Sequence, residues 1–404
     1  MKIVIATAVY YPMINGVAVF SHNLAVGLAQ RGHEILVLCP SQNGKNHVKM
    51  EDGVKVHYLK SMQAKFYPDQ IHAVPKKKRF WYRHGFRVSV FPFRQVKKIM
   101  NDFRPDVVHV QVSDPIGLSV VGWAKHAGVP VVTTEHNQPD VITSQLKLGI
   151  IKKPADALLA AYFVNRQSKS DFVTMPTKKA IDDLIWSRGK EFNVPIAAVS
   201  NGVDLRNFKP GRAPASIYDK YGLDKKAMTV LYVGRVDPEK SVGSVIEAYL
   251  KTKDVIGDSQ LVIVGDGVDK ARLIELAKGH KDIHFLGRVV VPELYDVYKL
   301  GDVFMTASEI ETQGIVLIEA AASGLPLIAV DAGAVREVCV NNVNGYLCKP
   351  GDVDGMASSL EKILSDKELR EKFSKKSSEI AEEHDFERTL DKFINIYNNV
   401  IKHK

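Results

Sequence analysis

Two glutamates and a glycine occupy one short segment in a pattern that could bind sugars and phosphate. Glu311 and Glu319 can each accept hydrogen bonds from neighbouring hydroxyl groups, so one would hold a hexose and the other a ribose. A helix is predicted to begin near Gly314, and the first N–H groups of a helix have no partner within it. The amides of Gly314, Ile315 and Val316 would therefore suit phosphate oxygens. The spacing of the glutamates alone carries no information; the glycine after a predicted strand makes the combination specific.

A second segment, which follows a predicted strand over 228–233, carries two cations. Arg235 and Lys240 come after Gly234 and before a predicted helix. A planar arginine fork and a lysine point charge could together hold a diphosphate. A cation near a helix N-terminus is mildly unfavourable, so a bound anion would explain these two side chains. The alternative is that both are ordinary surface cations.

Further polar candidates stand at predicted strand ends in the first half of the chain. Asn15 and Gly16 lie at a strand-to-helix turn, where a glycine lets backbone amides approach a ligand. The turn is not GxGxxG, so a nicotinamide or flavin site is not predicted. His109, Gln111 and His136 follow the next strands. We expect His109 to be a structural histidine and His136 to contact a sugar or to act as an acid–base group.

No cysteine and histidine spacing indicates a metal site, so we predict no metal and no cofactor. Asp352 and Asp354 are expected to be the N-cap and first-turn acid of a helix rather than ligands. The three cysteines, Cys39, Cys339 and Cys348, lack paired spacing, which is typical of a reducing compartment.

The composition is that of an ordinary folded protein: 404 residues, 45% hydrophobic and 25% charged. This excludes a disordered chain and a small disulfide scaffold. No apolar run approaches the about 20 residues that span a bilayer, and the apolar N-terminus lacks a signal-peptide cleavage site. We therefore expect a cytoplasmic protein, or one on the cytosolic face of the cell membrane.

The positive charge is concentrated in residues 76–104. This segment holds ten basic residues and one acid, which equals the whole net charge of +9. Its interleaved aromatic residues fit an anionic bilayer surface, but also single-stranded nucleic acid or a solvated loop packed on its own domain. We expect membrane contact, and no nucleic acid partner, because the charge is confined to one segment. The residues predicted to touch the membrane are Lys76, Lys77, Lys78, Arg79, Trp81 and Arg83.

The elements that must position these residues are alternating strands and helices. Short β-branched runs alternate with amphipathic segments almost from end to end, which predicts parallel sheets covered by helices on both faces. The series restarts after about residue 200, so we predict an α/β protein of two doubly wound domains with a cleft between them. The expected boundaries are 1–195, 196–384 and a C-terminal helix over 385–404.

These features resemble the retaining glycosyltransferases of family four. The resemblance covers nearly the whole chain and rests on Asn15-Gly16, on the segment from Gly234 to Lys240, and on that from Glu311 to Glu319. It implies the GT-B fold, in which two Rossmann-like domains face each other across a cleft. Further landmarks are Asn201 to Asp204, Gly265-Asp266-Gly267 and Asn344-Gly345. The C-terminal helix would cross back onto the N-terminal, acceptor-binding domain.

The resemblance also implies roles by matching position. Arg235 and Lys240 would grip the diphosphate, Glu319 would bind the ribose and Glu311 the transferred sugar. The phosphate site would be completed by Gly16 and the amides of Gly314 to Val316, and the base would meet backbone near Gly287, Arg288 and Val289.

Two positions depart from the family pattern. Ser241 stands where the family usually has Gly or Asn, which bears on how the next helix begins. Gln111 stands near a sugar-contacting histidine of some relatives, so that contact would pass to His136.

The Glu-Thr-Gln-Gly segment and the basic segment together resemble enzymes that glucosylate diacylglycerol. The expected reaction is retaining, metal-independent transfer of glucose from UDP-glucose to a lipid such as diacylglycerol at a membrane surface. One alternative is mannosyl transfer from GDP-mannose to a phosphatidylinositol-type or polyprenyl lipid, and another is a soluble acceptor. From other classes, a nucleotide-sugar epimerase and a non-catalytic nucleotide-sugar sensor stay open.

Overall fold

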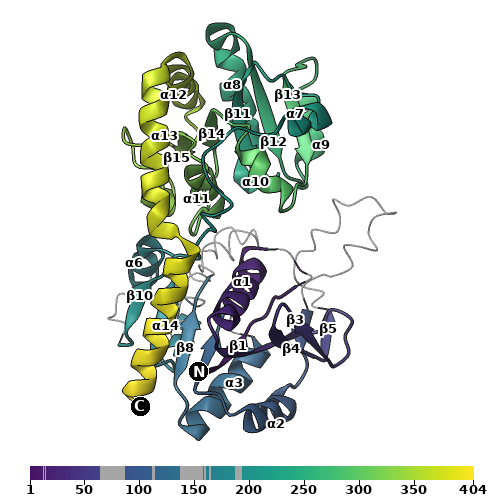
Figure 1. Ribbon diagram of the computed structural model, residues 1–404, viewed down its shortest axis with the longest axis vertical. Helices are drawn as coiled ribbons and strands as arrows, with labels where there is room; N and C mark the ends of the chain where they lie inside the picture. The colour runs from purple at the N-terminus through teal and green to yellow at the C-terminus, as the bar shows by residue number, and fades with distance from the viewer. Residues whose placement is uncertain are drawn as a thin grey trace. The chain divides into compact units, whose positions relative to one another are not determined.

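The computed structural model (Figure 1) contains two compact units. It describes the chain except for Pro12, Ile14 and residues 64–86, 112–113, 137–157, 159–160, 163–164 and 187–192. The first unit comprises Met1–Asn201 and Thr389–Lys404, and the second comprises Gly202–Arg388. All six residues predicted to touch a membrane, Lys76 to Arg83, lie outside the described residues.

The first unit is built on an eight-stranded sheet of order β10-β9-β8-β7-β1-β2-β4-β3. Its strands pair in parallel except for the antiparallel hairpin of β3 and β4. The strands of this sheet are β1 (Lys2–Ala6), β2 (Glu34–Pro40), β3 (His47–Glu51), β4 (Val54–Leu59), β7 (Val107–Val110), β8 (Val131–Thr134), β9 (Phe172–Met175) and β10 (Ile196–Ala198). A separate short pair, β5 (Ser61–Gln63) and β6 (Arg87–Ser89), is antiparallel. The sequence analysis missed the hairpin strand β3 and this pair.

The second unit is built on a six-stranded parallel sheet of order β13-β12-β11-β14-β15-β16. Its strands are β11 (Met228–Val233), β12 (Ser259–Val264), β13 (Ile283–Gly287), β14 (Val303–Thr306), β15 (Leu327–Val330) and β16 (Gly345–Cys348). The five strands expected from the sequence in this half, over 228–233, 261–264, 283–286, 303–306 and 327–330, lie within these bounds, whereas β16 was missed.

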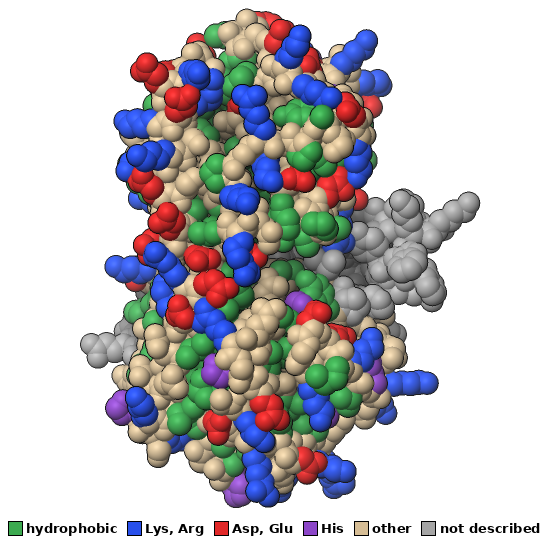
Figure 2. Space-filling model, viewed as in Figure 1, with side chains coloured by type: hydrophobic (Ala, Val, Ile, Leu, Met, Phe, Trp, Pro, Cys, Tyr) green, Lys and Arg blue, Asp and Glu red, His purple; other side chains and the backbone are tan. Residues whose placement is uncertain are grey.

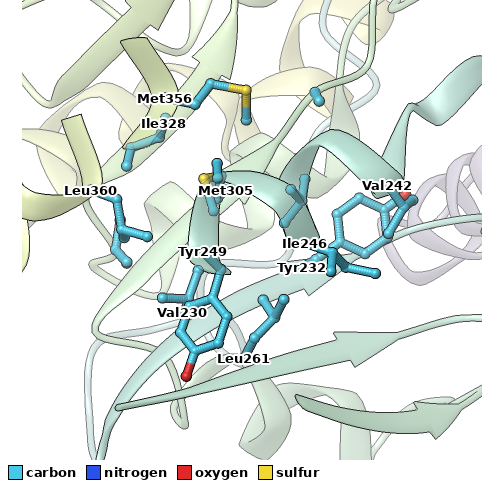
Figure 3. Packing of buried hydrophobic residues seen from close by; sticks show 14 of the residues in the cluster. Val230, Tyr232, Val242, Ile246, Tyr249, Leu261, Met305, Ile328, Met356 and Leu360 are labelled. Carbon is cyan, nitrogen blue, oxygen red and sulfur yellow. The ribbon is translucent and has the colours of Figure 1, made fainter. Parts of the chain in front are cut away.

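Alternating residues of β11 enter the two cores on opposite faces of this sheet, as expected for a strand covered on both sides. Val230 and Tyr232 belong to one core (Figure 3), while Leu231 and Val233 belong to the other. Helix α8 covers the first face and helix α11 the second. The longer helices are α1 (Gly16–Gln30), α2 (Phe93–Phe103), α3 (Pro115–Ala127), α6 (Lys178–Trp186), α8 (Val242–Ile256), α11 (Ile315–Ala322), α12 (Val353–Ser365), α13 (Lys367–Ala381) and α14 (Phe386–Lys402), and the shorter ones are α7 (Ala215–Tyr221), α9 (Lys270–Leu276) and α10 (Glu293–Tyr298).

Each sheet has a point where the strand order reverses. In the first sheet β1 lies between β2 and β7, and in the second β11 lies between β12 and β14. Ligands of such sheets bind outside the carboxyl ends of the strands at this point. The loops after β11 and β14 are therefore the place to look for a site in the second unit.

Helix α14 carries the chain from the second unit into the first. Its residues Leu390, Phe393 and Tyr397 are buried, and Figure 1 shows the helix running alongside the first unit to the C-terminus. Burial of large apolar and aromatic side chains stabilises such packing by roughly 1.5–3 kcal/mol each. The apolar side chains along this helix, which the sequence places on one face, are thereby covered, except that Phe386 is half-buried.

Cationic and anionic side chains are mixed on the face shown in Figure 2, as expected from the balanced charge outside residues 76–104. In the described part of the chain, no helix is both long enough and apolar enough to cross a membrane.

Candidate active site

Lys240 and Glu311 form an ion pair at the reversal point of the second sheet. Nζ of Lys240 lies 2.7 Å from Oε1 of Glu311, and both side chains are largely buried. The ammonium group also donates to Oγ of Ser308 at 3.1 Å and to the carbonyl of Ile310 at 3.2 Å. The loop after β11 and the loop after β14 thus meet through one cation with three fixed acceptors. These three hydrogen bonds fix the position of the Lys240 ammonium group before any substrate binds.

Arg235 shortly precedes Lys240 in the sequence, but its guanidinium group donates hydrogen bonds to other carboxylates. It donates to Asp237, and its second amine lies 2.6 Å from Oε1 of Glu239. The arginine side chain is 45% exposed. A diphosphate at Arg235 would therefore compete with two carboxylates for the same donors.

Glycines let the loops after β11 and β12 approach closely. A Cβ atom on Gly265 would lie 1.7 Å from the carbonyl oxygen of Gly234, and one on Gly267 would lie 2.1 Å from that of Val236. Backbone bonds lock this contact, since Val236 N donates to Asp266 O at 3.0 Å. The predicted Gly265-Asp266-Gly267 landmark thus serves to seat the loop that carries Arg235 and Lys240.

Helix α11 begins at Ile315, one residue after Gly314. Gly314 adopts φ +73°, a conformation that glycine reaches without strain, and its carbonyl accepts the first bond of the helix from Leu317. The amides of Gly314, Ile315 and Val316 precede the hydrogen-bonded turns and stay available to an anion. The predicted helix start is confirmed.

Glu319 lies on the first turns of α11 in a largely desolvated position. Tyr298, at the end of α10, donates its hydroxyl to Oε2 of Glu319 at 2.6 Å. Burial raises the pKa of the Glu319 carboxyl to about 7, and the tyrosine hydrogen bond opposes part of this rise. Glu319 therefore changes charge near neutral pH. Sequence reasoning missed Tyr298, which no local signal connects with Glu319.

The remaining predicted residues of the second unit have simpler surroundings. Arg288 is exposed and Val289 half-buried in the loop after β13, where Val289 packs on the core.

Ser241 adopts φ +47° between a 3₁₀ turn and α8, a left-handed conformation that favours glycine or asparagine. This conformation fits the Gly or Asn that the resemblance leads us to expect at this position.

Asn15 and Gly16 lie in the first unit, at the beginning of α1. Oδ1 of Asn15 accepts from the amide of Ala18 at 2.9 Å, so Asn15 is the N-cap of this helix. Gly16 is the first helical residue and is exposed. The capping hydrogen bond explains why an asparagine stands at position 15. Gly16 has no side chain, so a ligand can approach the backbone there.

The predicted histidines form one buried network in the first unit. Nε2 of His136 donates to Oε1 of Gln111 at 2.8 Å, and the amide of Gln111 lies 3.2 Å from Nε2 of His109. Nδ1 of His109 lies 2.6 Å from the hydroxyl of Tyr397 on α14. Burial lowers the pKa of His109 to about 3, with a smaller effect of His136, and that of His136 to about 4. Both rings are therefore neutral at pH 7, and His109 is a structural residue, as expected.

Among the described residues, no group of three His, Cys, Asp or Glu side chains could hold a metal ion. Asp352 caps α12 by accepting from the amide of Gly355 at 2.8 Å, which confirms its predicted role. The candidate site of the second unit thus consists of cations, carboxylates and free amides.

Comparison with known proteins gives matches over both units. Residues 14–207 match the family model described as Glycosyltransferase Family 4, and residues 216–379 match the model described as Glycosyl transferases group 1. The alpha-monoglucosyldiacylglycerol synthase of Acholeplasma laidlawii is 30% identical over 339 residues, which cover 81% of this chain and 80% of the relative.

Two further matches also extend over most of the chain. The GDP-mannose-dependent alpha-mannosyltransferase of Mycobacterium tuberculosis is 30% identical, over 88% of this chain and 85% of the relative. The solved structure of the Anabaena protein HepE in complex with UDP-glucose superposes with a TM-score of 0.71 at 15% identity, and the match covers 99% of this chain and 100% of that chain.

Proposed function

We propose that this chain, which belongs to glycosyltransferase family 4 and has the GT-B fold, transfers a hexose from a nucleotide-sugar to a lipid hydroxyl group. The observation that carries the proposal is the Lys240–Glu311 pair beside the amide-lined beginning of α11. Because the two side chains are adjacent, a donor with its diphosphate at Lys240 would present its hexose to Glu311.

The donor roles follow from the chemistry of each group. Arg235 and Lys240 would neutralise the diphosphate, with the amides of Gly314 to Val316 completing its site. Glu319 would accept the ribose hydroxyls, and Arg288 and Val289 lie in the loop proposed to meet the base. The UDP-glucose complex of HepE supports UDP-glucose as the proposed donor.

The proposed mechanism retains the configuration of the anomeric carbon without a protein nucleophile. The bond from that carbon to the diphosphate oxygen breaks as the acceptor oxygen forms a new bond on the same face. The acceptor proton passes to the departing diphosphate oxygen. Lys240 and Arg235 stabilise the negative charge that develops there, which is a contribution that needs no metal ion. His136, neutral and fixed by Gln111, is proposed to contact a sugar substrate of the first unit.

The proposed acceptor is a lipid such as diacylglycerol, or a derivative of it, at an anionic membrane surface. The name of the Acholeplasma relative supports this acceptor class. Phe91 and Phe93 are 86% and 55% exposed beside the exposed cations of α2, Arg94, Lys97 and Lys98. Exposed aromatic and basic side chains together suit a lipid surface. They extend the proposed contact region of Lys76 to Arg83, and we propose a peripheral location on the cytosolic face of the cell membrane.

A mannosyl transfer is the second candidate, because the mycobacterial relative uses GDP-mannose by its name. A nucleotide-release assay separates the two. We expect UDP release from UDP-glucose with vesicles that contain diacylglycerol. GDP release from GDP-mannose on phosphatidylinositol vesicles would favour the mannosyltransferase, and release on soluble sugars alone would contradict a lipid acceptor.

Co-sedimentation with anionic vesicles tests the membrane contact. We expect salt-sensitive binding that weakens when Lys76, Lys77, Lys78 and Arg79 are replaced by Gln. The matched control replaces four exposed lysines of α13, namely Lys367, Lys372, Lys375 and Lys376. An equal loss in both variants would show that only net charge matters.

A further inference from the structure

A pocket of about 690 Å³ opens in the first unit, and its lining includes none of the candidate site residues described above. This volume is in the range of small-molecule sites. It is lined by the loops that follow β1 and β2, by α1 and by the β3–β4 hairpin, so it lies at the carboxyl edge of the sheet, where ligands of such folds bind. Its lining residues are Tyr11, His22, Gln42, Asn43, His47, Lys49, Met50, Glu51, Asp52 and Tyr58.

Aromatic rings form much of the pocket wall. The rings of His47 and Tyr58 stack with centroids 4.5 Å apart and planes 9° apart. Tyr11 meets His22 edge to face, with centroids 4.4 Å apart. Rings held in this way are rigid flat surfaces, against which the C–H face of a sugar ring can pack without a large entropic cost.

Hydrogen-bond acceptors complete the pocket. Glu51 accepts the hydroxyl of Tyr58 at 2.9 Å on both of its oxygens, which fixes the carboxylate in place. Asp52 lies 3.3 Å from Nε2 of His22 and is 68% exposed, so most of its oxygen lone pairs stay free. Oε1 of Gln42 is buried and has no hydrogen-bond partner among the residues that the structure describes. A buried amide oxygen without a partner is costly, so a donor from a ligand would stabilise it.

The charge of the lining selects against anions. The lining contains two carboxylates, those of Glu51 and Asp52, and one ammonium group, that of Lys49. Nζ of Lys49 lies 4.0 Å from Oε1 of Glu51. A phosphate or carboxylate ligand would be repelled, whereas hydroxyl groups would donate to these oxygens. Aromatic walls with carboxylate and amide acceptors are suited to a neutral, hydroxyl-rich ring.

We propose that this pocket binds a neutral hexosyl group carried by the acceptor, so that a glycosylated diacylglycerol is used in preference to the bare lipid. The inference rests on the proposed function, because it assigns the sugar to the acceptor of that reaction. The same chemistry would recognise a free glycoside, and the experiment has one arm for each source.

The first arm measures binding without turnover. Glucosylglycerol is titrated into the full chain and followed by calorimetry or ligand-observed NMR. Gln42→Met removes the unpartnered oxygen while it breaks no hydrogen bond of that atom, so this variant should fold and bind at least fivefold more weakly. Glu51→Gln should weaken binding as well. Glu34→Gln is the matched control, because Glu34 lies in β2 and pairs with Lys2 outside the pocket, and it should bind normally.

The second arm compares acceptors in the nucleotide-release assay, with vesicles that contain diacylglycerol, glucosyl-diacylglycerol or neither, and with free glucosylglycerol. Preference for the glycosylated lipid supports the inference. Equal use of both lipids, preference for free glucosylglycerol, or no glucosylglycerol binding overturns it. So does glucosylglycerol binding by Gln42→Met and Glu51→Gln that is as tight as that of the unchanged protein. If no donor releases nucleotide with any acceptor, the proposed transferase function fails, and the pocket is then decided by the binding arm alone.

Discussion

The hydroxyl of Tyr397 lies 2.6 Å from Nδ1 of His109, although 288 positions separate the two residues. Tyr397 comes from α14 and His109 from the central strand β7, and both are fully buried. The side chain of Gln111 contacts both His109 and His136, and His136 is a proposed sugar contact. The C-terminal helix therefore fixes the position of a candidate site residue of the first unit.

Tyr397→Phe should destabilise the first unit by about 1–3 kcal/mol, because it removes the 2.6 Å partner of a buried ring nitrogen and leaves only the Gln111 amide at 3.4 Å. Chemical denaturation followed by circular dichroism measures this change. Tyr346→Phe is the matched control, since the Tyr346 ring packs on Phe373 and its hydroxyl makes no hydrogen bond in the described part of the chain. Equal losses in both variants would mean that the His109 bond contributes nothing.

The buried histidines also predict how stability depends on pH. Burial lowers the pKa of His109 to about 3 and that of His136 to about 4, whereas both would be about 6.5 in the unfolded chain. The unfolded state therefore binds more protons below pH 6.5. Each histidine should therefore make folding less stable as pH drops from 6.5 to 4, by at most about 1.4 kcal/mol per pH unit. Burial raises the pKa of the Glu319 carboxyl to about 7 and that of Asp114 to about 6, and these two groups act in the opposite direction, so the histidine effect is measured as the difference in pH dependence between this protein and His136→Asn. Equal pH dependence of the two proteins between pH 7 and pH 5 would contradict this prediction.

Lys240→Ala should reduce turnover by about a hundredfold or more, because the ammonium group is proposed to stabilise the leaving diphosphate. Arg235→Ala should also reduce it steeply. The rate of nucleotide release under saturating donor measures both. Lys253→Ala is the control, since Lys253 forms a similar ion pair with Asp282 at 2.7 Å away from the site. A near-normal rate in Lys240→Ala would refute the assigned role.

Much of this site could be predicted from the sequence because its main parts follow strands. β11 and β14 have the predicted bounds, and the carboxyl ends of neighbouring parallel strands must meet at one edge. Lys240 and Glu311 therefore had to be close, whatever the details of their loops. The charge and chemistry of each residue were also available from its type alone.

The contacts that refine the site could not be predicted, because they join residues that no local pattern connects. Tyr298 reaches Glu319 from another helix, and its role depends on how α10 and α11 pack. Strand β3 was missed because it is short and largely exposed, and only two apolar residues, Val48 and Met50, alternate with its polar ones. Its Asp52-Gly53 turn, with φ of +48° and +82°, is a hairpin signal that could have revealed it.

Glu319 predicts a pH-dependent affinity for the nucleotide. With a pKa of about 7, its carboxyl is mostly protonated below that pH and becomes an acceptor for two ribose hydroxyls above it. The affinity for UDP should therefore rise by up to about tenfold per pH unit from 5.5 to 7 and then level off. Calorimetric titration of UDP at several pH values measures this.

Glu319→Gln is the comparison, because glutamine does not titrate and the ionisation of UDP itself is common to both proteins. The ratio of the two affinities should change only below about pH 7 and should be constant above it. Parallel pH profiles of the two proteins would show that Glu319 does not bind the nucleotide in its ionised form.

Gly333 fixes the backbone of the loop that carries Glu311. It adopts φ +56°, and a Cβ atom there would lie 2.4 Å from the carbonyl oxygen of Glu311. The neighbouring amide of Ala334 donates to that same oxygen at 3.0 Å. Gly333→Ala should therefore displace Glu311, and a shift of about 1 Å in a positioning group can cost a hundredfold in rate.

Gly351→Ala separates this displacement from backbone strain. Gly351 has φ +74°, and nothing lies within 4 Å of the Cβ position, so this variant pays the left-handed conformational cost of about 1–2 kcal/mol without a clash. Gly333→Ala should lose more stability than Gly351→Ala in thermal melts, because it adds a backbone clash to the same conformational cost, and only Gly333→Ala should lose nucleotide release. If the two variants kept equal activity, Glu311 would not need its observed position, and its assignment to the transferred hexose would be wrong.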